Sequence, residues 1–199
     1  MVETRSSLQP ALRTAFAALN AHPVCRSLRG MTSPGTCHLV GGGLRDAVLG
    51  IPPRDLDVVV SGSGQAISQA LADEYNTRVI ELGGDRFAAF RLVAGDMQID
   101  IWDRGDSTLT SDMLRRDLTI QSLAMEIHDG TLADPFGGLD DLAGGTLRMT
   151  SPDSFSDDPL RIMRLSRFAA QLPDFQIEPH TLEQAAQSTS ELTNIASER

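Results

Sequence analysis

The spacing of apolar and polar residues along the chain distinguishes the expected helices from the expected strands. Apolar residues at helical spacing predict helices at residues 7–20 and 66–75, and a short helix at 44–49. Short β-branched and apolar runs bounded by glycine and proline predict strands. These runs lie at residues 38–40, 55–61, 77–82, 88–93 and 98–102. The mixture predicts an α/β domain.

The second half of the chain becomes helical in pattern. Residues 103–112 are polar and predict a loop, and a helix is expected at residues 111–125. Ser156, followed by two acids and Pro159, is typical of a helix start, because serine caps backbone N–H groups and proline is tolerated in the first turn. This helix should run through Ala170.

Three parts follow from this change of pattern. Residues 1–30 form an expected N-terminal helical extension, and residues 31–149 an α/β head. Residues 150–199 form the beginning of an all-helical neck, with a last helix expected from Thr181 towards Ser197. No run approaches the ~18 apolar residues that a membrane span needs, and the first residues lack a secretory pattern.

The net charge of the chain limits how it can bind nucleic acids and nucleotides. The formal net charge is −10, and the 17 basic residues are all arginine. Such a balance argues against a protein that coats nucleic acid through bulk electrostatics, so any nucleotide contact must come from local clusters. Two clusters stand out: Arg115 with Arg116, and Arg161 with Arg164 and Arg167.

The two cysteines, Cys25 and Cys37, lack the spacing of metal ligands. Reduced thiols are their expected state, as in most proteins of the cytosol. We therefore expect a cytoplasmic protein.

Asp55 and Asp57 are the first candidate metal ligands. Residues i and i+2 of a strand point to the same face, so the two carboxylates lie side by side and repel each other. Mg²⁺ relieves this repulsion, because it takes oxygen ligands and accepts substrate phosphates in its remaining positions. Two such ions can stabilise the attacking and leaving oxygens in phosphoryl transfer. Taken alone, an Asp-x-Asp pair is more often a surface or turn feature.

A glycine run precedes this strand. Gly41, Gly42 and Gly43 stand between an expected strand and an expected helix, where backbone N–H groups can approach phosphates. Arg45 is expected in the first turn of that helix, placed to reach a phosphate oxygen, and Asp46 is expected to orient the turn. The run is neither a P-loop nor a dinucleotide fingerprint. By itself it is equally consistent with a tight turn.

Together the two features resemble a known signature. The stretch 38–60, HLVGGGLRDAVLGIPPRDLDVVV, is similar to that of polymerase-β-like nucleotidyltransferases, specifically class II tRNA nucleotidyltransferases (CCA-adding enzymes) and bacterial poly(A) polymerases. The likeness continues in order over roughly residues 37–199. Its further motifs are LRRDLTIQSL at 114–123, DPFGG with DDL and LR within 134–148, DDPLR at 157–161 and IASER at 195–199. The resemblance implies a head with a mixed sheet and flanking helices, followed by a helical neck.

Metal and triphosphate contacts are the first roles that this resemblance implies. Asp55 and Asp57 bind Mg²⁺, while Gly42 and Arg45 hold the triphosphate. Asp100, on an adjacent expected strand, stands where such enzymes place a third acid. It could assist the metal or deprotonate the attacking 3′-hydroxyl, and the alternative is a solvent-facing carboxylate.

Nucleotide contacts are implied further along the chain. Arg116 and Asp117 correspond to the residues that contact the nucleotide and its ribose, and Asp112 is expected to cap the helix that carries them. Arg164 and Arg167 fall where the family has arginines, as candidates for binding triphosphate, tRNA phosphate or neighbouring acids.

Asp158 and Arg161 form the candidate base-selecting pair. On one helix face they are i, i+3 neighbours, and they supply an acceptor and donors respectively. Cytosine and adenine each present an amino donor beside a ring-nitrogen acceptor, whereas uracil and guanine present the opposite polarity there. A fixed pair would accept C and A and reject U and G, because rejection leaves buried polar groups unpaired. The alternative is an ordinary intrahelical salt bridge.

The resemblance implies a template-independent tRNA nucleotidyltransferase that uses Mg²⁺ to add CMP and AMP from CTP and ATP to tRNA 3′ ends. A poly(A) polymerase, or an enzyme that adds only CC or only A, shares these motifs. A different class is a nucleotide-binding head without RNA turnover. The sequence stops inside a family motif, at Arg199, so the region that holds the tRNA is largely absent from it. A shortened chain, a natural minimal form and a partner that supplies the rest are all consistent with this.

Some positions depart from the family pattern. Gln121 and Ser122 stand where Asn-Ala is usual, Asp157 replaces Glu and Leu118 replaces Phe. None of these changes removes a proposed catalytic group. Gln121 is the one expected to alter ribose or loop contacts.

Overall fold

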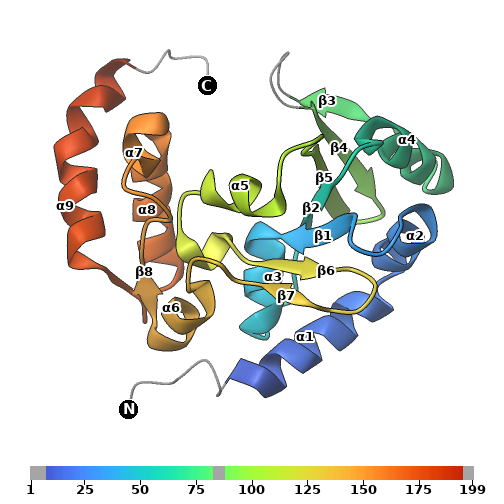
Figure 1. Ribbon diagram of the computed structural model, residues 1–199, viewed down its shortest axis with the longest axis horizontal. Coiled ribbons are helices and arrows are strands. Elements are labelled where there is room, and N and C mark those ends of the chain that lie inside the picture. The colour runs from blue at the N-terminus through green and yellow to red at the C-terminus, as the bar shows by residue number, and fades with distance from the viewer. Residues whose placement is uncertain (1–7, 83–87, 195–199) are drawn as a thin grey trace.

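A seven-stranded mixed sheet forms the centre of the molecule (Figure 1). The computed structural model describes residues 8–82 and 88–194. The strand order is β3-β4-β5-β2-β1-β6-β7, with β2 and β5 parallel and the other neighbouring pairs antiparallel. The strands are β1 (Cys37–Val40), β2 (Asp55–Val60), β3 (Ile80–Leu82), β4 (Ala88–Ala94), β5 (Met97–Asp103), β6 (Ala124–Glu126) and β7 (Leu132–Ala133). The expected mixed sheet with flanking helices is confirmed.

One face of this sheet is buried beneath four helices. Alternate strand residues such as Leu56, Val58 and Ile99 point to this face and are inaccessible or nearly so. The helices are α1 (Gln9–Ala21), α2 (Pro23–Met31), α3 (Gly41–Val48) and α4 (Gly64–Glu74). Within the N-terminal extension only the helix at residues 7–20 was expected, and α2 is a second one. The buried positions of α2 are spaced as on one helix face, and a proline begins the helix.

The segment after β5 differs from its prediction. Instead of one helix over 111–125, α5 (Leu109–Leu114) is followed by a single 3-10 turn, η2 (Thr119–Gln121), and then β6. The helix stops because Leu118 is extended, with φ −122° and ψ 151°, and pairs with Met149 in an antiparallel bridge. Tertiary pairing therefore overrides the helical pattern, and α5 covers part of the sheet face opposite α1–α4.

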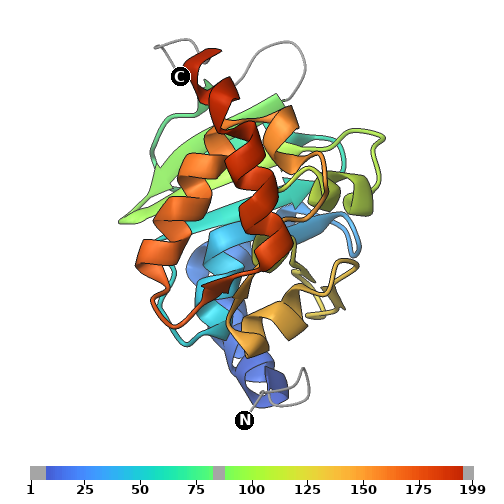
Figure 2. The same ribbon diagram turned by 90° about the vertical axis from the view of Figure 1, so that its left-hand side faces the viewer.

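The neck packs beside the head (Figure 2, where α8 and α9 stand in front of the sheet). The remaining elements are α6 (Gly138–Gly144), β8 (Thr146–Leu147), α7 (Ser154–Asp157), α8 (Leu160–Gln171), β9 (Gln176–Ile177), α9 (Pro179–Gln187) and the 3-10 helix η3 (Ser188–Asn194). The neck is helical as expected, with one addition. Its two-residue strand β9 pairs in parallel with β8 and ties the neck to the end of the head.

The helix expected to start at Ser156 is interrupted at Asp158. Ser156 lies inside the short helix α7, and α8 begins only at Leu160. Asp158 between them is extended, with φ −151° and ψ 98°. Pro159 causes this, because its ring disfavours a helical conformation of the preceding residue. Asp158 and Arg161 therefore do not share a helix face.

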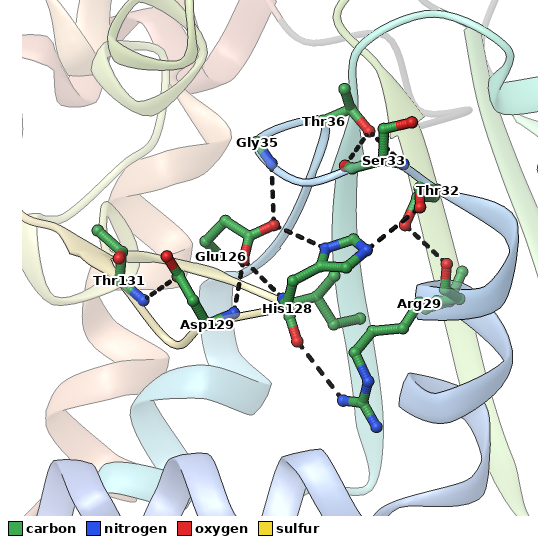
Figure 3. A network of polar contacts seen from close by, with 11 residues as sticks. Arg29, Thr32, Ser33, Gly35, Thr36, Glu126, His128, Asp129 and Thr131 are labelled. Atoms are coloured by element: carbon green, nitrogen blue, oxygen red, sulfur yellow. Dashed lines mark hydrogen bonds and ion pairs between the residues drawn. The ribbon is translucent and has the colours of Figure 1, made fainter.

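A buried carboxylate fastens the loop before β1 to the turn after β6 (Figure 3). Glu126 is 6% exposed and accepts hydrogen bonds from the N–H groups of Gly35, His128 and Asp129. The ring of His128 lies between Glu126 Oε1, at 2.8 Å from Nδ1, and the carbonyl oxygen of Thr32, at 3.2 Å from Nε2. Burial raises the pKa of Glu126, but these donors outweigh it and lower that pKa to about 2.

None of the described helices has both the length and the apolar character needed to cross a bilayer. The last family-like motif, residues 195–199, and the first seven residues of the expected extension lie outside the described residues.

Candidate active site

Three carboxylates lie on the open face of the central strands. Asp55 and Asp57 belong to β2, and Asp100 lies directly beside Asp57 in the parallel register of β2 and β5. Their side chains share the sheet face opposite helices α1–α4. Asp55 is exposed, while Asp57 and Asp100 are half-buried. The structure thus brings together the three acids singled out in the sequence.

Asp100 is held by an arginine that the sequence analysis did not single out. Arg91 on β4 donates from Nε to Oδ1 and from Nη2 to Oδ2 of Asp100, both at 2.7 Å. This two-pronged geometry fits the planar guanidinium. The antiparallel register of β4 and β5 places Arg91 opposite Asp100. The sequence alone does not reveal which strands pair, so it could not identify Arg91.

The pKa of Asp57 is raised above its ordinary value. Burial is the largest cause, and the nearby charges of Asp55 and Asp100 add to it. The guanidinium of Arg116 and the N–H of Gly42 act in the opposite direction. The balance leaves Asp57 as a carboxylate that a further cation would stabilise.

The glycine run is itself the first turn of α3. Gly41 has φ +69°, which lets the chain pass directly from β1 into the helix. A Cβ on Gly41 would lie 2.3 Å from Asp57 Oδ2, and one on Gly43 would lie 2.5 Å from the carbonyl oxygen of Asp55. Both glycines are therefore needed for the close approach of α3 to the acidic strand.

Arg45 consequently lies in the second turn of α3, not the first as expected. It is 8% exposed and donates from Nε to Asp46 Oδ1 at 2.8 Å, so Asp46 orients the side chain of Arg45. Its Nη1 is buried and has no hydrogen-bond partner among the described residues. A buried donor without a partner is costly and is consistent with a ligand site.

The Arg115–Asp117 segment forms another wall. Asp112 does not cap α5 as expected, since Thr108 does so; it pairs with Arg115 at 2.7 Å and with Arg116 at 3.2 Å. Asp117 is 4% exposed and accepts from Arg164 Nε at 2.6 Å. Arg116 Nε is buried without a hydrogen-bond partner among the described residues.

The neck contributes a fixed acceptor and a fixed donor. Asp158 Oδ1 accepts from the N–H of Leu160 at 3.2 Å. The Nη1 of Arg161 donates to the carbonyl oxygen of Ser154 at 3.0 Å, and its Nη2 donates to that of Arg115. The two side chains are thus held by backbone groups and not by each other.

Two adjoining cavities collect these residues. A cavity of about 240 Å³ lies between the Arg115–Asp117 segment and the neck, and one of about 580 Å³ lies over the three acids. The smaller is lined by Gly41, Gly42, Asp57, Arg115, Arg116, Asp117, Gln121, Asp158, Arg161 and Arg164. The larger carries Gly42, Arg45, Asp55, Asp57, Arg91, Asp100, Gln121, Arg164, Arg167 and Phe168, among others. Every candidate site residue of the sequence therefore borders one of the two.

Two lining residues gain importance from the structure. Gln121 borders both cavities, is 6% exposed, and has an Oε1 without a hydrogen-bond partner among the described residues. In the sequence it departed from the family pattern and was expected to alter ribose or loop contacts. Phe168 belongs to the hydrophobic core and also lines the larger cavity.

The chemistry of the acidic donors suits Mg²⁺. Two adjacent carboxylates, Asp55 and Asp57, match an ion that binds through one or two carboxylates and leaves positions for phosphates and water. Asp100 is occupied by Arg91 in this arrangement. No group of three or more His, Cys, Asp or Glu residues with the geometry of a metal cage occurs in the part of the chain described. Asp55 and Asp57 are therefore available as an open pair of carboxylate ligands.

Comparison with known proteins identifies the family of the chain. A family model described as the poly(A) polymerase head domain matches residues 37–148. The multifunctional CCA protein of Azoarcus sp. (strain BH72) is 37% identical over 180 residues, which are 81% of this chain and 42% of that protein. The CC-adding tRNA nucleotidyltransferase of Geobacter sulfurreducens is 37% identical over 161 residues, covering 80% of this chain and 37% of that protein.

Solved structures give the same result. A CCA-adding enzyme in complex with CTP superposes with a TM-score of 0.78 at 30% identity, covering 93% of this chain and 48% of that one. The Thermotoga maritima CCA-adding enzyme complexed with tRNA gives 0.71 at 34% identity, covering 81% and 40%. The chain thus spans less than half the length of these relatives. Because the family model covers more than half of the chain, the protein belongs to the poly(A) polymerase head-domain family of nucleotidyltransferases.

Proposed function

We propose that this chain is the catalytic head, with the beginning of the neck, of a tRNA nucleotidyltransferase. It would transfer CMP or AMP from CTP or ATP to the 3′-hydroxyl of tRNA and release pyrophosphate. One observation carries the proposal. Asp57 lines both the cavity that contains Asp55 and several arginines and the cavity that contains the Asp158/Arg161 pair, an arrangement suited to metal-assisted transfer of a selected nucleotide.

Asp55 and Asp57 are the proposed ligands of Mg²⁺. When bound, the ion supplies positive charge for the phosphate oxygens at the reacting centre. The N–H of Gly42 orients Asp57, and Arg45 offers its buried Nη1 to the triphosphate. Asp100, held by Arg91, is the proposed acceptor for the proton of the attacking hydroxyl, which requires the pair with Arg91 to open.

The ribose and base are the proposed ligands of the smaller cavity. Arg116, Asp117 and Gln121 line it, and the Oε1 of Gln121 has no hydrogen-bond partner among the residues that the structure describes. Asp158 and Arg161 are fixed by backbone partners, so a base would meet a pre-oriented acceptor and donor. Discrimination of C and A from U and G would follow from unpaired polar groups in the rejected complexes.

The division into an extension (1–30), a head (31–149) and a neck (150–199) remains a proposal. The end of the matched family region, residue 148, supports the second boundary. The first boundary is weaker, because α1 packs on α3 and α2 on α4. A cytoplasmic location is also proposed, and Cys25 and Cys37, both buried and unbridged, support it.

The test is a nucleotide-preference assay with Mg²⁺ and tRNA that lacks its 3′ CCA. We expect incorporation of labelled C and A but not U or G. Long A tracts on any RNA would instead indicate a poly(A) polymerase, and C alone or A alone a partial enzyme. Binding of CTP or ATP without any incorporation would contradict the catalytic proposal and indicate a nucleotide-binding head.

A further inference from the structure

Phe168 gathers three guanidinium groups where α8 meets α3. Its ring is buried, with 2% exposed. The guanidinium carbons of Arg45, Arg164 and Arg167 lie 5.4, 5.7 and 5.2 Å from the ring centre. All three distances fall within the ~6 Å range of a cation–π contact. Arg45 belongs to the head, and the other two arginines belong to the neck.

The positive charge of this cluster is only partly neutralised by the protein. Arg164 pairs with Asp117, and Arg45 pairs with Asp46. No ion pair of Arg167 is found within residues 8–82 and 88–194. The Nη1 of Arg45, on a side chain only 9% exposed, has no hydrogen-bond partner there either. Three cations around one ring, with a buried free donor, favour an anionic ligand.

The position of the cluster identifies the part of the ligand that it meets. Phe168 and its three arginines line the same cavity of about 580 Å³ as Asp55 and Asp57. A metal held by these carboxylates binds phosphate oxygens, so the arginines face the same phosphates from another side of the cavity. A polyphosphate chain spans such a site, whereas a base has no charge to offer to three arginines.

We propose that Phe168 is a positioning residue that assembles Arg45, Arg164 and Arg167 into one subsite for the polyphosphate group of the nucleotide. The ring attracts guanidinium groups through its negative faces and limits their spread. This gives Arg164 and Arg167 a defined role and makes the subsite depend on both head and neck. The identity of the nucleotide rests on the proposed function, but the anion subsite can be tested without it.

The experiment measures binding of inorganic tripolyphosphate to the full chain by titration calorimetry at low salt and without Mg²⁺. Phe168→Leu removes the ring and keeps an apolar side chain, and Phe168→Tyr restores the ring. Phe90→Leu is the matched control, because Phe90 is also buried, at 6% exposure, but borders neither cavity. We expect about tenfold weaker binding for Phe168→Leu, given three cation–π contacts, and near-parental binding for the other two variants.

Salt dependence separates positioning from a general loss of structure. In the parent, affinity should fall steeply with salt because several charges contact the anion, and Phe168→Leu should show a shallower slope. If Phe168→Leu does not fold, Arg167→Gln, on the exposed side of α8, should still weaken tripolyphosphate binding severalfold. Parental affinity and slope in Phe168→Leu, or parental affinity in Arg167→Gln, would overturn the proposal.

A second titration distinguishes the two sources of phosphate. A short single-stranded RNA without terminal phosphates should bind the parent and Phe168→Leu alike. Loss of RNA binding in Phe168→Leu with tripolyphosphate binding intact would assign the cluster to the RNA backbone and contradict the proposal. Because neither titration involves nucleotide transfer, an inactive chain would leave the result interpretable.

Discussion

Arg164 Nε donates to Asp117 Oδ2 at 2.6 Å and thereby joins neck helix α8 to the nucleotide-facing segment of the head. The carboxylate is 4% exposed, whereas the arginine side chain is 47% exposed. The carbonyl oxygen of Asp117 also accepts from the N–H of Thr150 and from Ser154 Oγ. One buried residue therefore couples the wall of the smaller cavity to the position of the neck.

Replacing Arg164 with methionine should lower the free energy of unfolding by about 1–2 kcal/mol, since a buried carboxylate loses a charged hydrogen-bond donor. Urea denaturation measures this. Arg167→Met is the matched control, one helical turn away and without a described ion pair, and should change stability by less than about 0.5 kcal/mol. Equal effects of the two substitutions would contradict the stabilising role of the Arg164–Asp117 pair between neck and head.

Gly41 is expected to be irreplaceable for a reason beyond its backbone conformation. Gly41→Ala and Gly50→Ala both place a side chain at positive φ, +69° and +75°, at a cost of roughly 1–2 kcal/mol. Only at Gly41 would the new Cβ meet Asp57, since nothing lies within 4 Å at Gly50. Calorimetric titration with Mg²⁺ and CTP should therefore show lost binding for Gly41→Ala alone. Equal binding by the two variants would show that the contact with Asp57 is unimportant.

Gln121 should affect stability and binding with opposite signs. Its buried Oε1 lacks a partner in the described structure, so Gln121→Leu should stabilise the protein by about 1 kcal/mol. The same change should weaken CTP and ATP binding severalfold, because the nucleotide loses an acceptor. Gln121→Asn, with the residue usual in the resembled family, should retain binding. A leucine variant that binds nucleotides normally would indicate a purely structural glutamine.

Glu126 predicts a specific acid sensitivity. Its folded pKa of about 2 lies below the ordinary value of 4.5, so its ionised form stabilises the fold fully above pH 4.5. This contribution is lost as the pH falls from 4.5 towards 2, because the unfolded chain binds the proton first. The stability difference between the parent and Glu126→Gln, from denaturation at several pH values, should shrink over this window. Glu183→Gln, at an exposed position on α9, should show no such change.

The sequence was sufficient for the elements with strong local signals. The β-branched run that follows Asp55 and Asp57 predicted β2, and the glycine run predicted a tight connection between a strand and a helix. The glycine run could not reveal that Gly41 begins the helix, because this depends on how closely α3 approaches β2. The role of Pro159 was misjudged, since its effect on Asp158 outweighed the capping signals before it.

Contacts between residues far apart in the chain could not be predicted from the sequence. Arg91 becomes visible only through the register of β4 and β5, and Phe168 only through the approach of α8 to α3. Leu118 ended a predicted helix because Met149, far along the chain, offered it a strand partner. Local periodicity does not encode such long-range pairings.

The most direct test of the central claim is the rate of labelled CMP transfer to tRNA lacking its 3′ end, measured against Mg²⁺ concentration. Asp57→Ala should reduce the rate by at least about a hundredfold at every Mg²⁺ concentration. Asp96→Ala, which removes an exposed carboxylate in the turn before β5, should match the parent. Transfer by Asp57→Ala at the parental rate and with the parental Mg²⁺ dependence would contradict the assignment of Asp55 and Asp57 as the metal-binding centre.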